Sequence, residues 1–220
     1  MSDTPNARAE GAETEHRLKV LFLTNLPSPY RVKFFNELGR HCDFRTGHGL
    51  SDQRVLSYIG ALGQSKKVDL LAAALDVMWR EDPRVRVLVA GRGVLEHLLA
   101  PAVERGQVIL LGYADASVKA LMAAVSSALL NPGRIGLIAV DALVLGRPIL
   151  TTRYPFHAPA FEYLHEGDSM FVADMTPAAF ADLALKAAYR PGVQSDWDFP
   201  TMPNMVENFY QGCIALLESK

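Results

Sequence analysis

Short apolar runs alternate with longer segments of helical hydrophobic spacing along most of the chain. Runs this short are typical of strands buried on both faces, and apolar positions three and four residues apart are typical of helices. The pattern predicts strands at residues 55–59, 85–90, 108–111, 128–130, 149–151 and 170–172. It predicts helices between them at residues 68–80, 94–104, 117–125, 137–145 and 177–189. The alternation therefore predicts an α/β fold: a doubly wound, Rossmann-like parallel sheet with helices on both faces.

The same pattern divides the chain into segments outside this domain. Residues 1–16 are polar and aperiodic, which predicts a disordered tail. An apolar run at 18–24 and a helical spacing at 31–40 predict an extra N-terminal strand–helix unit. The expected boundaries are 1–16 for the tail, 17–41 for this unit, 42–54 for a linker, 55–190 for the Rossmann-like domain and 191–220 for a C-terminal helical segment.

Composition excludes some classes of function. The net charge of −2 gives no electrostatic case for nucleic-acid binding. No apolar run is long enough to predict a transmembrane helix, and the N-terminus lacks the apolar core of a signal peptide. Cys42 and Cys213 stand in no motif, which favours reduced thiols and a cytoplasmic protein. The scattered histidines predict no metal site.

Glycines follow several of the predicted strands, at the edge where ligands bind in such sheets. They are Gly60, Gly91, Gly93, Gly112, Gly133 and Gly136. Glycine is common in strand-to-helix turns, so each turn alone is weak evidence. Their coincidence at one edge predicts a nucleotide site. The pair Gly91 and Gly93 also leaves open a nicotinamide-dependent oxidoreductase, although the third glycine of that fingerprint is replaced by Glu96.

The stretch 131–152 carries the most information. It predicts a buried strand, a glycine turn, a short helix and another strand. The helix would point its first amides at a bound oxygen-rich ligand. Asp141, inside this helix, could accept hydrogen bonds from a pair of ribose hydroxyls.

This stretch resembles the nucleotide-sugar site of GT-B glycosyltransferases, specifically the retaining glycosyltransferase family 4. The family has an acidic residue, a glycine turn and a second acidic residue on the next helix. Here Gly133 stands at the first acidic position and Asp141 at the second. The turn consists of Arg134, Ile135 and Gly136.

A second stretch, 58–71, resembles the family motif in which an arginine and a lysine hold the leaving diphosphate. Lys66 matches the lysine, whereas Ala61 replaces the arginine and Lys67 replaces the usual glycine. The resemblance implies that Lys66 and Asp141 are the catalytic residues. A cation is needed there because negative charge accumulates as the sugar–phosphate bond breaks.

Two further residues complete the expected nucleotide-sugar site. Tyr113, in the turn after the third strand of the domain, could contact the nucleobase, or it could simply cap the core. His157 matches a histidine found in some family members, or it could be bonded to backbone. The family usually needs no metal, and no other cofactor is implied.

The resemblance covers the donor-binding half of a GT-B enzyme, and only the 17–41 unit resembles part of an acceptor domain. That unit would expose apolar side chains unless a second copy or a partner chain covered it. We therefore expect a glycosyltransferase that binds a nucleotide sugar, shortened and of low or no activity. The alternative is a non-catalytic nucleotide-sugar-binding module, or a half-enzyme that acts with a partner chain.

Overall fold

The computed structural model describes residues 44–50, 52–113, 115–190, 197 and 202–218. The predicted N-terminal unit at 17–41 lies outside these residues. The strands are β1 (Arg54–Ile59), β2 (Val85–Ala90), β3 (Val108–Gly112), β4 (Leu129–Leu130), β5 (Ile149–Thr152) and β6 (Met170–Ala173). The α-helices are α2 (Val68–Glu81), α3 (Ala100–Glu104), α4 (Ala116–Val125), α5 (Ile138–Leu145), α6 (Pro177–Ala188) and α7 (Met202–Glu218).

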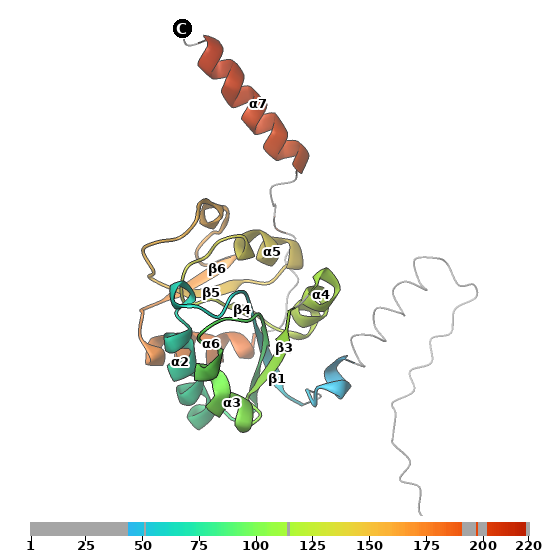
Figure 1. Cartoon of the computed structure of the whole chain (residues 1–220), viewed down its shortest axis with the longest axis vertical. Helices are drawn as coiled ribbons and strands as arrows, with labels where there is room; N and C mark the ends of the chain where they lie inside the picture. The colour runs from blue at the N-terminus through green and yellow to red at the C-terminus, as the bar shows by residue number, and fades with distance from the viewer. Residues whose placement is uncertain (1–43, 51, 114, 191–196, 198–201, 219–220) are drawn as a thin grey trace, which may run out of the picture.

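The six strands form one sheet in the order β3-β2-β1-β4-β5-β6, and every pair is parallel (Figure 1). This confirms the predicted doubly wound, Rossmann-like class. The chain changes direction across the sheet between β1 and β4, and the helices that follow these two strands, α2 and α5, cover opposite faces. Ligands in open α/β sheets bind at such a switch point, beyond the carboxyl ends of the strands.

Alternating strand residues supply two apolar cores, one on each face of the sheet. Leu56 and Tyr58 of β1 pack in the core beneath α2, α3 and α6. Val55 and Ile59 point to the other face and pack with α4 and α5. The near-continuous burial of β1 and β2 reflects this double coverage, as expected for a parallel sheet.

Local signals fix where several helices begin and end. The hydroxyl of Thr176 accepts from the backbone amide of Ala179, and Pro177 occupies the first turn of α6. Asp115 caps α4 in the same way by accepting from the amide of Val118. Gly146 ends α5 in the left-handed conformation.

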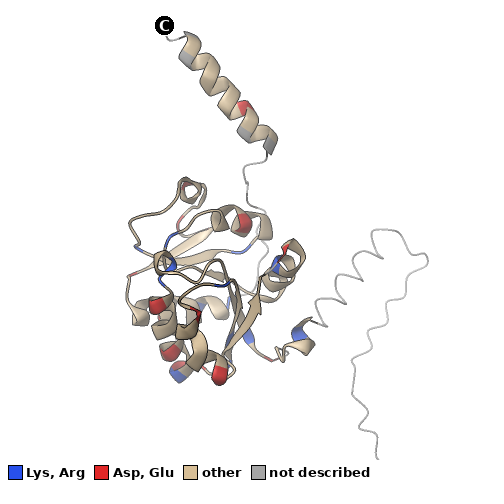
Figure 2. Cartoon of the chain, in the orientation of Figure 1, with Lys and Arg blue, Asp and Glu red and all other residues tan. Residues whose placement is uncertain are grey.

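Residues before β1 also belong to the packed structure. Residues 44–47 are helical, and Leu50 is fully buried in the core beside α4 and α5. In contrast, α7 extends away from the sheet and its helices (Figure 1). Acidic and basic positions are interspersed along the ribbon of the domain (Figure 2).

Candidate nucleotide-sugar site

The glycine turns after β1, β2 and β3 lie against one another at the carboxyl edge of the sheet. The amide of Gly91 donates to the carbonyl of Gly112 over 2.7 Å. A Cβ atom added to Gly91 would lie 1.8 Å from the carbonyl oxygen of Gly60, and one added to Gly93 would lie 2.2 Å from that of Leu62. The backbones therefore approach more closely than any side chain allows. The structure brings four of the predicted site glycines together at this edge.

The loop after β4 interlocks with the loop after β1. A Cβ atom on Gly133 would lie 2.4 Å from the carbonyl oxygen of Ser65 and 2.7 Å from the Cα of Lys66. The amide of Arg134 donates to the Ser65 carbonyl over 2.7 Å, and Lys66 Nζ donates to the Arg134 carbonyl over 2.6 Å. Ser65 and Lys66 lie in the 3-10 helix η1 (Gln64–Lys66). Two segments almost seventy residues apart are thus joined at the switch point.

This junction is electropositive. Burial lowers the pKa of Lys66, and the nearby positive charge of Arg134 lowers it further. Among the described residues, neither Lys66 nor Arg134 forms an ion pair with a carboxylate. Two adjacent cations with no acidic partner favour a bound anion.

His157 fixes the glycine turn from the other side. Its Nδ1 accepts a hydrogen bond from the backbone amide of Ile135 over 3.1 Å, so Nε2 carries the proton of the neutral ring. The imidazole stacks on Phe161 at 4.0 Å between ring centroids, with the planes inclined by 5°. Burial lowers the pKa of His157, and the charge of Lys66 adds to this effect. The sequence offered a ligand contact or a backbone bond for this residue, and the structure shows the backbone bond.

Asp141 lies on α5, where its carboxylate is paired with a residue that the sequence analysis missed. Lys119 Nζ, on α4, lies 3.0 Å from Asp141 Oδ2. Both side chains are partly exposed, and Oδ1 of Asp141 has no hydrogen bond within the described residues. A ribose hydroxyl could therefore still donate to this carboxylate. Because the two residues lie 22 positions apart on different helices, no sequence motif links them.

Two other predicted site residues, Tyr113 and Gly136, do not take part in the junction between Lys66 and Arg134. The side chain of Tyr113 is 87% exposed, so it does not cap the core. Gly136 has open space around its Cα apart from the methyl group of Ala158. Asn131, which sequence analysis did not select, is buried just before the turn, and its Oδ1 has no partner in the described structure. Within the described ranges, no three His, Cys, Asp or Glu side chains gather as metal ligands.

Comparison with known proteins supplies the family context. Residues 53–188 match the family model described as glycosyl transferases group 1. No curated protein is significantly similar to the chain in sequence. Among the helices that the structure describes, none is long and apolar enough to cross a membrane.

Solved glycosyltransferase structures share the fold. HepE from Anabaena in complex with UDP has a TM-score of 0.59 at 16% identity, and the match covers 83% of this chain and 53% of HepE. HepE in complex with UDP and glucose gives 0.58, with 16% identity and coverage of 83% and 52%. A mutant of S. aureus TarM bound to fondaparinux, alpha-GlcNAc-glycerol and UDP gives 0.53 at 16% identity, over 63% of this chain and 29% of TarM. The chain thus spans about half of HepE and less of TarM, and at this identity the likeness shows the fold alone.

Proposed function

Because the chain belongs to the glycosyl transferases group 1 family, we propose that it binds a nucleoside diphosphate sugar at the switch point between β1 and β4. The proposed reaction is transfer of the glycosyl group with retention, as in glycosyltransferase family 4. The observation that carries the proposal is the junction of Lys66 with the turn at Gly133 and Arg134. HepE structures that hold UDP, UDP with glucose, or UDP-glucose support this choice of ligand.

Each group at the junction has a proposed part. The Lys66 ammonium binds the diphosphate, where charge accumulates as the glycosyl bond breaks. Arg134, one residue past Gly133, supplies a second cation beside it. Asp141 accepts from the ribose through Oδ1 while Lys119 holds Oδ2. His157 positions the turn through the amide of Ile135. No metal or other cofactor has a part in this proposal.

One observation favours a weaker activity. The family places an acidic residue where this chain has Gly133, and the backbone of Ser65 and Lys66 occupies the space that any side chain would need. The second candidate function is therefore a nucleotide-sugar-binding module, or a half-enzyme that acts with a partner chain supplying an acceptor domain. In this view residues 17–41 are a remnant of such a domain. Without such a partner, transfer would be slow, because orientation of the acceptor supplies much of the rate.

A thermal-shift panel with UDP, GDP and ADP and their sugars tests the proposal. A ligand in excess of its dissociation constant raises the melting temperature by mass action. We expect one nucleotide class to do so and its sugar to add to the shift. Absence of any shift at millimolar ligand would contradict the proposed site. Release of nucleoside diphosphate from the stabilising sugar then separates an enzyme from a binding module.

A further inference from the structure

A cavity of about 460 Å³ opens at the other edge of the sheet, where the strands begin. Its walls come from the start of β1, the ends of α4 and α6 and the turn before β5. Four arginines line it, and no lining residue is Asp or Glu. They are Arg45, Arg54, Arg147 and Arg190. The volume is in the range of small-molecule sites in proteins.

Arg147 is a buried cation without a buried counter-ion. Its side chain is only 7% exposed. Its Nε donates to the carbonyl of Ala123 over 2.6 Å and its Nη1 to that of Gly146 over 3.3 Å. No described carboxylate forms an ion pair with it. A buried charge that is not neutralised is costly, so an anion in the cavity would stabilise this arrangement.

Two more of the four arginines, Arg54 and Arg190, are held by aromatic rings. Arg54 lies over the ring of Tyr189 at 5.0 Å from its centroid, and Arg190 lies over Phe171 at 4.4 Å. These contacts orient the guanidinium groups. Within the described part of the chain, neither Arg54 nor Arg190 forms an ion pair with a carboxylate. Cations elsewhere in the described domain, such as Arg105 and Arg153, instead pair with aspartates.

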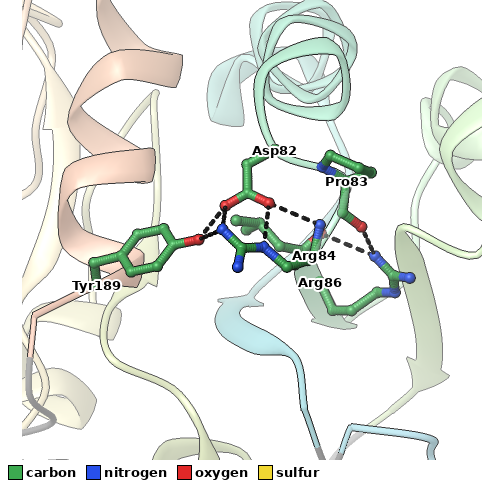
Figure 3. A network of polar contacts seen from close by, with 6 residues as sticks. Asp82, Pro83, Arg84, Arg86 and Tyr189 are labelled. Atoms are coloured by element: carbon green, nitrogen blue, oxygen red, sulfur yellow. Dashed lines mark hydrogen bonds and ion pairs between the residues drawn. The ribbon is translucent and has the colours of Figure 1, made fainter.

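The carboxylate of Asp82, which lies next to the cavity, is already bonded to other side chains. Asp82 forms an ion pair with Arg84, and its carboxylate also accepts from the hydroxyl of Tyr189 (Figure 3). These bonds, led by the one from Arg84, lower the pKa of Asp82 to about 2. Because Arg84 already balances Asp82, this carboxylate does not neutralise the cavity. The network fixes the ring of Tyr189 as part of the wall.

A buried acceptor completes the lining. Gln53 Oε1 is buried and has no hydrogen-bond donor in the described structure. The carbonyl groups at the ends of α4 and α6 offset part of the positive charge, and that of Ala123 is already bonded by Arg147. We propose that this cavity is a second ligand site, separate from the nucleotide-sugar site, that takes a phosphate-bearing small molecule. Arg54, Arg147 and Arg190 bind the phosphate, and Gln53 accepts from a hydroxyl of the ligand.

Binding of inorganic phosphate and pyrophosphate to the full chain tests the proposal, by calorimetry and thermal shift at constant ionic strength. We expect pyrophosphate to bind, and the Arg54→Ala/Arg190→Ala double variant to weaken it at least about tenfold, as for loss of charge-assisted bonds. Arg147→Lys should also weaken it. Arg80→Ala, a change to an exposed arginine on α2, should leave the affinity unchanged.

The Lys66→Ala variant separates the two sites. Pyrophosphate binding that persists in Lys66→Ala and is lost in the double arginine variant places the anion in this cavity. Loss in Lys66→Ala with retention in the arginine variant would place it at the nucleotide-sugar site and overturn the inference. No pyrophosphate binding at all, or equal binding of citrate, would overturn it as well. Failure of nucleotide sugars to bind would leave this result unaffected, because the cavity shares no residue with the junction.

Discussion

Lys66 Nζ lies 2.6 Å from the carbonyl oxygen of Arg134, so the loops after β1 and β4 are bonded through the side chain proposed to hold the diphosphate. A bound diphosphate would compete with this carbonyl for the ammonium. The lysine is held near the position where it would act, which lowers the entropy lost on binding.

Replacing Lys66 by alanine should weaken nucleoside diphosphate binding more than Asp141→Asn does. Lys66 would make charge-assisted bonds, whose loss costs about 1.5–3 kcal/mol, or roughly ten- to a hundredfold in affinity. Asparagine at 141 can still accept from a ribose hydroxyl, and the lost ion pair is partly exposed and contributes little. Calorimetry with the free diphosphate measures both. Equal affinities for parent and Lys66→Ala would remove Lys66 from the site.

Arg134 should carry part of the function of the arginine that is missing at Ala61. Arg134→Ala is expected to weaken diphosphate binding about tenfold. Adding Ala61→Arg to that variant should restore much of the affinity, because Ala61 lies in the same loop as Lys66. Arg153→Ala, which removes an exposed arginine paired with Asp174, is the control. An unchanged affinity in Arg134→Ala would show that its side chain faces solvent in the complex.

Gly133 should not tolerate any side chain. Its Cβ would meet backbone atoms of Ser65 and Lys66 at 2.4–2.7 Å, and backbone cannot swing aside as a flexible side chain can. Gly133→Ala should destabilise the domain by about 1–3 kcal/mol, as measured by denaturant unfolding. The family-like change Gly133→Glu should therefore lower stability without creating activity. Gly167→Ala, in a loop with open space, controls for glycine replacement, although its positive φ adds a smaller cost. A stable, active Gly133→Glu protein would contradict this.

Lys67 should be a strained position. It is the non-glycine residue with a left-handed backbone in the described chain, at φ 53°, and it stands where the family has glycine. Lys67→Gly removes a steric cost of roughly 1 kcal/mol, partly offset by the greater freedom of glycine when unfolded. We expect a small rise in melting temperature for Lys67→Gly and none for Lys67→Ala, which keeps the strain. A rise in melting temperature in both variants would show that removal of the positive charge of Lys67, and not relief of backbone strain, is the cause.

The stability contributed by His157 should depend on pH. Its pKa in the folded protein is lowered from 6.5 by burial and by Lys66, so folding disfavours the protonated ring. Protonation would also place a second N–H against the amide of Ile135. The contribution is therefore fully present above about pH 6.5 and is lost as pH falls through the lowered pKa. The difference in melting temperature between parent and His157→Gln should shrink from about pH 7.5 to pH 5. A difference that grows on acidification would contradict the assigned tautomer.

Hydrophobic periodicity was sufficient to predict the sheet and its helices, because both faces are buried and each strand is a short apolar run. The ends of β2 and α5 were placed within a residue. Periodicity failed where local geometry decides. The predicted helix 94–104 is interrupted, since residues 96–99 form a 3-10 helix before α3 begins at Ala100, with Pro101 in its first turn. Leu50 lies in a polar stretch predicted as linker, and only its tertiary packing shows that it is buried.

The sequence pattern indicates which positions lie at the candidate site, but it does not indicate which of their side chains contact one another. Strand ends and motif spacing pointed to Lys66 and Gly133, since parallel strands bring their carboxyl ends to one edge. The hydrogen-bond or ion-pair partner of each side chain depends on the tertiary structure, which brings together residues that are far apart in the sequence. The pairing of Asp141 with Lys119 and the bond from Ile135 to His157 are of this kind.

The pairing of β1 with β4 has a further consequence for dynamics. The two halves of the sheet meet through a two-residue strand, with a register of one residue pair, Ser57 with Leu129. Few backbone hydrogen bonds join β1 to β4, so we expect the domain to open between these two strands in sub-global unfolding. The bonds from the loop at Arg134 to Ser65 and Lys66 join the same two halves. A ligand that contacts both loops would hold the two halves of the sheet together. Slower amide hydrogen exchange at Ser57 and Arg134 would then detect binding, independently of any glycosyl transfer.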